Sequence, residues 1–185
     1  MNYLKTHTTG IDIPIQSFQI FMYGALKKVW GISNDTDFDL YGRAHNNPRD
    51  SGFVPEAYNG NGGYTELLFN DQKKVGQGFF VAGGNEEYKL GTVTGKVGMV
   101  LMLNMKGILG ANVTQMQDEQ INMQVMKLAA PPRGQYTVTG LVKRIDNIFS
   151  EYPQWKDTVK FTDMFPYHCL RIDLSMMYNI YQCGS

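Results

Sequence analysis

The sequence predicts an α+β fold, in which a mixed or antiparallel β-sheet packs against helices and carries long projecting loops. Its 185 residues are 43 % hydrophobic and 12 % aromatic, which is enough apolar surface for one compact core. Segments with a two-residue apolar period come in runs, and segments with a helical period flank these runs. A doubly wound α/β sheet would instead alternate strands and helices regularly. We therefore expect a single domain over residues 1–185.

The first segment with a clear period is a helix over residues 14–30. Apolar side chains recur at steps of three and four from Ile15 to Val29, and Gly31 supplies a stop. Residues 1–12, ahead of this helix, have no such period. We expect them to form a flexible arm, because chain ends without buried side chains are poorly ordered.

A short strand and a long polar loop follow the helix. Residues 38–43 alternate between apolar and polar side chains, which predicts a half-buried strand. Residues 46–63 are rich in Asn and Gly: residues 46–52 have turn chemistry, and residues 59–63 favour positive φ. This composition predicts a loop over residues 46–63 that projects from the body.

The middle of the chain predicts strands. Residues 64–69 and 75–81 have strand composition and a short polar connection, which predicts a β-hairpin. Gly83-Gly84-Asn85 predicts another turn. The run from Thr92 to Met105 becomes continuously apolar at residues 99–103, as in a central strand that is buried on both faces.

The last third predicts one further helix, a mixed segment and a strand. Residues 117–130 keep a helical period and end at Pro131-Pro132, where a helix cannot continue. Residues 136–139 are strand-like and residues 141–149 fit a helix, so the boundary between them stays open. Residues 167–178 alternate apolar and charged side chains, which predicts a C-terminal strand.

Charge and composition exclude several classes of protein. Seventeen basic residues balance seventeen acidic ones, so the chain lacks the positive field that favours binding to nucleic acid. Residues 1–10 have no apolar core of a signal peptide, and nowhere do 18 apolar residues follow one another, so we expect no membrane span. Cys169 and Cys183 are too few for a disulfide framework, and we expect reduced thiols in a protein made in the cytoplasm.

The sequence predicts no catalytic residue, no metal site and no cofactor. His7, His45 and His168 fall in three different segments. His168 and Cys169 are adjacent on a predicted strand, so their side chains point to opposite faces and cannot easily share a metal ion. A Cys169 nucleophile would need a distant histidine as its base, whereas a buried cysteine is usually a small hydrophobic residue.

Two features predict a docking surface. Large, stiff aromatic side chains on loops bury area at a small entropic cost, which makes them good interface residues. Methionines are concentrated between Met99 and Met126, and their flexible thioethers fit either a loosely packed interior or contacts between subunits. The residues predicted to form a subunit or partner interface are Arg43, Asn46, Arg49, Phe53, Val54, Tyr58 and Tyr64.

Four phrases carry a resemblance to a known family. They resemble phrases of neck proteins from crAss-like tailed bacteriophages, and the resemblance spans the chain from Asp37 to Tyr178. None of them is a motif with a catalytic role. The phrases are Tyr41-Gly-Arg-Ala-His-Asn-Asn-Pro48, Gly52-Phe-Val-Pro-Glu-Ala-Tyr58 with Asn59-Gly-Asn-Gly-Gly-Tyr64, Arg144-Ile-Asp-Asn-Ile-Phe-Ser-Glu-Tyr152 and Asp163-Met-Phe-Pro-Tyr-His-Cys169.

The resemblance implies a structural virion protein that is not an enzyme. Such a protein forms a homo-oligomeric ring between portal and tail, with an architecture similar to tail-terminator proteins. The implied partners are copies of itself, with twelve favoured over six, and neighbouring portal, ring or tail proteins. DNA would pass through the central channel without sequence-specific binding, and the protein would reside in the neck of the virion.

Two other classes of function compete with this one. An accessory tail domain that binds a glycan or a receptor would also carry aromatic loops on a β-rich body, and it would bind glycan without forming a ring. A small hydrolase would need a convergent nucleophile and base, which the sequence does not offer.

Overall fold

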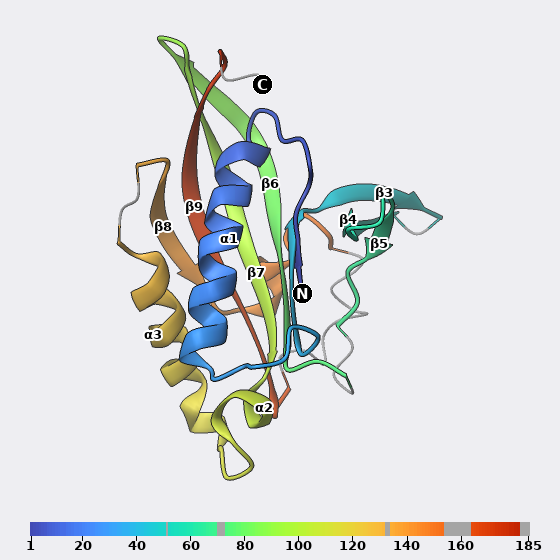
Figure 1. Ribbon diagram of the computed structural model, residues 1–185, viewed down its shortest axis with the longest axis vertical. Helices are drawn as coiled ribbons and strands as arrows, with labels where there is room; N and C mark the ends of the chain where they lie inside the picture. Colours follow the sequence, from blue (N-terminus) through green and yellow to red (C-terminus); the bar gives the residue numbers. More distant parts are fainter. Residues whose placement is uncertain (51, 70–72, 132–133, 154–163, 182–185) are drawn as a thin grey trace.

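A computed structural model of the protein describes residues 1–50, 52–69, 73–131, 134–153 and 164–181 (Figure 1). It confirms the α+β fold class, since these residues form a six-stranded mixed sheet, a three-stranded sheet and four α-helices. In chain order the elements are β1 (Asn2–Tyr3), α1 (Asp12–Val29), β2 (Phe38–Arg43), β3 (His45–Arg49), β4 (Gly52–Tyr58), β5 (Tyr64–Glu66), β6 (Gly76–Lys89), β7 (Thr92–Asn104), α2 (Met105–Leu109), a 3₁₀ turn (Gln115–Gln117), α3 (Asp118–Ala129), β8 (Tyr136–Val142), α4 (Ile145–Ile148) and β9 (Tyr167–Asn179).

The large sheet has the strand order β1-β2-β6-β7-β9-β8. β1, β2 and β6 run parallel, whereas each strand from β6 to β8 is antiparallel to its neighbour. β6, β7 and β9 have 14, 13 and 13 residues and extend beyond the other strands at one end (Figure 1). The sheet is therefore broad at one end and narrows to three strands at the other.

One face of the large sheet is covered by α1 and α3 (Figure 1). The predicted helix over residues 14–30 is confirmed as α1, and its apolar stripe from Ile15 to Leu26 is buried against the sheet. Gly31 follows it with a φ of +64°, a conformation that suits glycine at the end of a helix. The helix predicted over residues 117–130 is likewise confirmed as α3.

β7 is the central strand that the sequence predicts. Met99, Leu101 and Leu103 face α1 and α3, while Val100 and Met102 face the opposite side, and all five are fully buried. The C-terminal strand is confirmed as β9, which pairs with β7 along its whole length. β7 therefore fixes the order of the sheet around it.

The opposite face is covered by a second core, which we call the small-sheet core. It lies between the large sheet, the small sheet β3-β4-β5 and the segment around α4. The open boundary between residues 136 and 149 is resolved, because β8 ends at Val142 and α4 begins at Ile145. The buried members of this core are Tyr41, Ala44, Ala57, Leu67, Phe69, Phe79, Val81, Val100, Met102, Ile148, Phe149, Tyr152 and Cys169.

The strand predicted at residues 38–43 is confirmed as β2, but the prediction that it is half buried is wrong. Residues 38–41 of β2 are all buried, because β2 lies between β1 and β6 and both of its faces are covered. Asp39 alternates with apolar residues but is itself only 3 % exposed. Its carboxylate is compensated by the Lys74 ammonium at 2.9 Å, so a charged side chain in a strand does not mark a solvent face here.

The predicted hairpin between residues 64–69 and 75–81 is also wrong. β5 pairs with β4, and β6 pairs with β2 and β7. β6 also continues to Lys89 without the predicted turn at residues 83–85. These residues form a bulge at which the register against β7 shifts, since glycine suits a bulge as well as a turn.

Residues 46–63 form strands where the sequence predicts a loop. β3 and β4 are antiparallel neighbours, with Arg49 paired to Gly52, and a turn at residues 59–63 leads to β5. Pro48 and Pro55 make these strands hard to predict from the sequence. Proline is tolerated only in strands with an unpaired side or at strand ends, so it usually indicates a loop. The small sheet stands out from the side of the body (Figure 1).

The first residues of the chain are held within the fold. Asn2 and Tyr3 form β1, which pairs with β2, and the Tyr3 ring stacks on the Tyr41 ring at 4.4 Å. The Lys5 amide N–H donates to the Gln16 side chain of α1 at 2.9 Å. The segment predicted as a flexible arm over residues 1–12 therefore adds an edge strand to its own sheet.

Two glycines are expected to respond oppositely to a methyl group. A Cβ at Gly78 of β6 would lie 2.6 Å from Leu101 Cδ2 and 3.2 Å from the Val100 carbonyl oxygen, whereas a Cβ at Gly24 of α1 would meet no atom within 4 Å. Gly78→Ala should lower the free energy of unfolding by about 1–3 kcal/mol through overpacking. Gly24→Ala should raise it by about 0.5–1 kcal/mol through helix propensity.

Urea unfolding followed by circular dichroism measures both free energies. Because the two variants differ from the natural chain by the same methyl group, each is the control for the other. Equal effects at the two positions would contradict the close approach of β6 to β7.

Candidate functional site

The small sheet carries most of the residues that the sequence predicts to form an interface. Phe53 and Tyr64 are each 51 % exposed. The Tyr64 ring contacts the Tyr58 ring edge-on at 6.2 Å and the His45 ring at 5.4 Å. Phe53 pairs with Pro48, whereas Tyr64 pairs with Tyr58, and strand alternation places these two pairs on opposite faces. The small sheet thus offers an aromatic side chain on each face.

The polar residues of the predicted interface are distributed along β3. Asn46 is exposed. Arg49 is half exposed, and its guanidinium lies 3.6 Å from Glu56 and 3.9 Å from Glu66, distances at which exposed ion pairs contribute little. Val54 packs against the small-sheet core and holds β4 to the body. These residues lie on one small sheet, where the sequence predicts a loop, and Val54 is partly buried.

Arg43 lies apart from this group, in an ion-pair network at the base of the small sheet. Its Nε is 2.8 Å from Asp12 Oδ1, and the Lys5 ammonium is 3.0 Å from Asp12 Oδ2. Lys5 Nζ is also 3.3 Å from His45 Nε2. Burial and the neighbouring Lys5 and Arg43 charges lower the pKa of His45 below its ordinary value. Arg43 therefore joins β2 to the start of α1.

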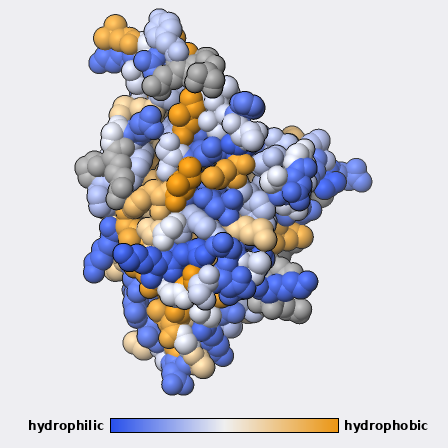
Figure 2. All heavy atoms as spheres, in the orientation of Figure 1, coloured by the Kyte–Doolittle hydropathy of each residue, from blue (hydrophilic) through white to orange (hydrophobic). Residues whose placement is uncertain are grey.

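The end of the β6-β7 hairpin is a second exposed surface, which the sequence analysis missed. Tyr88 is 64 % exposed, Leu90 92 % and the adjacent Tyr181 80 %. Figure 2 shows hydrophobic atoms at this end of the molecule, beyond the body that α1 covers. The sequence signal for this turn is the Leu90-Gly91 pair between two alternating runs, whereas the glycines at residues 83–84 lie in the bulge of β6.

Leu90 has an unusual backbone for a branched side chain. Its φ is +50° and that of Gly91 is +83°, the arrangement of a type I′ hairpin turn. Asn, Asp or Gly normally occupies the first of these positions, because a Cβ in the left-handed region costs about 1 kcal/mol. The exposed leucine therefore lowers the stability of the subunit. Residues in strained backbone conformations often lie at binding surfaces.

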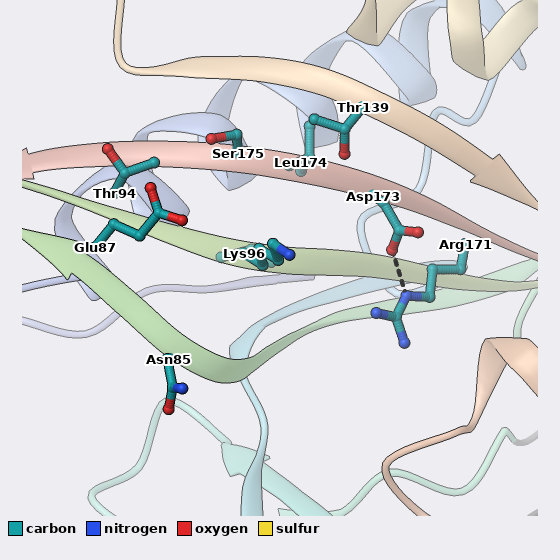
Figure 3. Close-up of a pocket in the computed structure, with 10 residues that line it drawn as sticks. Asn85, Glu87, Thr94, Lys96, Thr139, Arg171, Asp173, Leu174 and Ser175 are labelled. Carbon is teal, nitrogen blue, oxygen red and sulfur yellow. Dashed lines mark hydrogen bonds and ion pairs between the residues drawn. The ribbon is translucent and has the colours of Figure 1, made fainter.

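A polar pocket of about 450 Å³ lies on the open part of the large sheet (Figure 3). Lys96, Glu87, Arg171 and Asp173 are among the side chains that line it. The Arg171 Nε donates to Asp173 Oδ1 at 2.7 Å, and its Nη1 donates to Glu151 at 2.6 Å. Burial lowers the pKa of Arg171, and the bonds to the two carboxylates more than offset this, so its pKa lies above the ordinary value.

The described residues include no group of three or more His, Cys, Asp and Glu side chains that could hold a metal ion. His168 Nε2 lies 2.9 Å from the Asn122 side-chain oxygen, and Cys169 is a thiol buried in the small-sheet core. Their side chains face opposite sides of β9, as the sequence predicts. Cys183 lies outside the described residues. Among the described helices, each is too short or too polar to span a bilayer.

The methionine-rich segment has some side chains in the interior and others on the surface, so each of the two alternatives, core packing and subunit contacts, can apply to only part of it. Met99, Met102 and Met105 are buried, so they fill the cores on both sides of β7. Met116 in the 3₁₀ turn is 89 % exposed and Met123 of α3 is 53 % exposed, whereas Met126 of α3 is partly buried against the core. Interior packing therefore explains these methionines except Met116 and Met123.

No family model matches the sequence, and no curated protein matches it. The geometry of the surfaces and the residues that form them therefore carry the functional argument.

Two arginines of the predicted interface should differ in their effect on stability. Arg43→Met leaves the partly buried Asp12 with Lys5 alone, and we expect the free energy of unfolding to fall by about 1–3 kcal/mol. Arg49→Met removes only long, exposed ion pairs and should change it by less than about 0.5 kcal/mol. Chemical denaturation of the two variants checks this, and a larger loss for Arg49→Met would refute the assignment.

Replacing the strained leucine at the hairpin end should stabilise the isolated chain. Leu90→Asn suits the left-handed backbone, so we expect the free energy of unfolding to rise by about 0.5–1 kcal/mol. Leu90→Ala keeps a Cβ in that region without the polar side chain and should change it by less than about 0.5 kcal/mol. Thermal unfolding compares the two variants, and a melting temperature lowered by Leu90→Asn would argue against the turn geometry.

Proposed function

We propose that this chain is a structural protein of a tailed bacteriophage. It forms a homo-oligomeric ring in the neck between portal and tail, joins head to tail and leaves a channel for DNA. The single observation that supports this best is the presence of two unlike exposed surfaces on one compact body. They are the small sheet β3-β4-β5 at its side and the end of the β6-β7 hairpin beyond the three-stranded part of the sheet (Figure 1).

Ring assembly needs this asymmetry. A head-to-tail contact uses two different surfaces on each subunit, and it closes when the rotation between neighbours divides a full turn. Exposed aromatic and aliphatic side chains on both surfaces offer the apolar anchors on which binding energy usually depends. Phe53 and Tyr64 supply them on the small sheet, and Tyr88 and Leu90 supply them on the hairpin.

The four phrases that resemble neck proteins of crAss-like phages come together in one part of this fold. Tyr41, Ala57, Phe149 and Cys169 each belong to a different one of the four phrases, and all four residues are buried together in the small-sheet core. The phrases thus converge where the small sheet is attached to the body. This supports the assignment, because the attachment sets where the small sheet meets a neighbouring subunit.

The charge of the chain is compatible with a channel through which DNA slides. Equal numbers of acidic and basic residues give no general attraction for phosphates. In the proposed assembly, copies of the chain, twelve rather than six, contact each other around the channel and contact portal, ring or tail proteins above and below. DNA binding by the isolated chain is accordingly not part of the proposal.

An accessory tail domain that binds a glycan or a receptor is the second candidate. The paired rings of Tyr58 and Tyr64 favour it, because aromatic rings also bind sugars. Phe53 lies on the opposite face of the small sheet, so the three aromatic residues do not form one platform. Glycan binding by a chain that stays monomeric would select this alternative.

Removing the aromatic side chains of the small sheet should weaken assembly without unfolding the subunit. The double variant Phe53→Ser with Tyr64→Ser removes two half-exposed anchors. The loss of each anchor weakens an interface by about 1–2 kcal/mol, so the double variant should need a concentration at least tenfold higher to form the ring. Ile20→Ser, at a side chain of α1 that is 50 % exposed, is the matched control and should assemble normally.

Native mass spectrometry over a range of concentrations measures the assembly, and circular dichroism verifies that both variants fold. Rings that persist unchanged in the double variant would count against the small sheet as an interface. A natural chain that is monomeric at all concentrations would overturn the proposed function itself.

A further inference from the structure

Besides the short edge strand β1, the described part of the large sheet leaves part of β6 and all of β8 open on opposite sides. β2 pairs with β6 only as far as Arg43 and Phe80, so the part of β6 from Gly83 to Lys89 has β7 on one side and no described strand on the other. At the far side of the sheet, β9 is the one described strand that pairs with β8. These two edges are different in sequence and belong to one continuous sheet.

β8 has none of the charges or prolines that often protect an edge strand, although its register against β9 shifts between Val138 and Gly140. Natural sheets block exposed edges with lysine, proline or inward-facing charges, because an open row of N–H and C=O groups pairs readily with another strand. The seven residues of β8, Tyr-Thr-Val-Thr-Gly-Leu-Val, include no charge and no proline. They are rich in the β-branched side chains that favour strands. Its sequence is that of a strand with a partner on each side.

The open part of β6 presents backbone groups outward. Leu90 and Gly91 form a two-residue turn, so Lys89 and Thr92 are the hydrogen-bonded pair that closes the hairpin. Tyr88 and Val93 are then a pair without mutual hydrogen bonds. The amide N–H and the carbonyl of Tyr88 consequently point away from β7, toward the open edge.

The two edges have compatible directions and opposite charges. In the sheet order β6-β7-β9-β8, each strand runs opposite to its neighbour, so β8 runs opposite to β6. β8 of a second copy in the same orientation can therefore lie beside β6 as an antiparallel strand. On the open part of β6, Glu86 and Glu87 outnumber Lys89, whereas exposed Lys143 and Arg144 follow β8 directly. Lys143 forms an exposed ion pair with Glu119.

We propose that the open edge of β6 receives β8 of a second copy of this chain as an antiparallel strand, so that one sheet continues from subunit to subunit. This inference rests on the proposed self-assembly and names the contact that produces it. Each copy donates β8 to one neighbour and accepts β8 from the other, which is a head-to-tail arrangement.

The strand register sets the stagger between neighbours. β8 pairs with residues 171–176 of β9, which lie level with residues 95–100 of β7 and so with β6 from Phe79 to its bulge after Gly83. The open edge is the next stretch of β6, about four or five residues further on. Neighbouring copies are therefore displaced along the strands by about 15 Å at 3.4 Å per residue, and the strands tilt relative to the assembly axis.

Cross-linking between two single-cysteine variants tests the contact. Glu87 and Thr139 line the same face of the sheet (Figure 3), so their replacements would lie side by side across the joined edges. Glu87→Cys and Thr139→Cys, each combined with Cys183→Ser, are mixed in equal amounts and treated with a short bismaleimide. Cys169 is buried, so we expect the maleimide not to reach it. We expect a dimer band from the mixture, at least tenfold stronger than from either variant alone.

Two controls separate the edge contact from other outcomes. Lys28→Cys on the exposed side of α1, mixed with Glu87→Cys, should give no such band. Adding Tyr88→Pro, which removes the outward N–H, should reduce the band at least tenfold more than Tyr88→Ala, which keeps it. Oligomers that form without the band overturn the edge contact and leave the proposed function intact. A chain that forms no oligomer overturns both.

Discussion

The burial of β7 on both faces is the constraint on which the rest of the structure depends. A strand with apolar side chains from Met99 to Leu103 needs a layer on each side, so the sheet is covered by α1 and α3 on one face and by the small-sheet core on the other. β6 and β9 pair along β7 and are as long as it is. Their length carries the hairpin beyond the covered part of the sheet and leaves the last part of β6 without a described strand on one side.

The polar interactions hold the pieces around β7 in place. Asp12 receives Lys5 and Arg43, which ties the start of the chain, α1 and β2 together. Arg171 joins β9 to Glu151 in the segment after α4 and thereby holds the second layer over the sheet. Charged residues with such partners stabilise the subunit, whereas the exposed aromatic residues have no comparable role within it. The paired charged residues therefore belong to the packed body of the subunit, whereas the exposed aromatic residues belong to surfaces that are available to partners.

The elements that the sequence predicts correctly are those in which the spacing of apolar residues follows directly from which side of the element is buried. α1, α3, β7 and β9 follow from one-sided or continuous apolar patterns. The small sheet is missed because Pro48, Pro55 and the Asn and Gly residues around them resemble a loop, although strands of a small sheet need few ladder bonds. The partners of β2 and β6 depend on long-range pairing, which local patterns do not encode. For the same reason, the tie of Arg43 to Asp12 was not predictable.

Electron cryomicroscopy of the purified chain tests the central claim most directly, because it shows whether copies meet head to tail through unlike surfaces. The account predicts closed rings with a central channel, in which the sheet of one subunit continues into that of the next. Two-fold symmetric dimers, or particles that stay monomeric at high concentration, would contradict it.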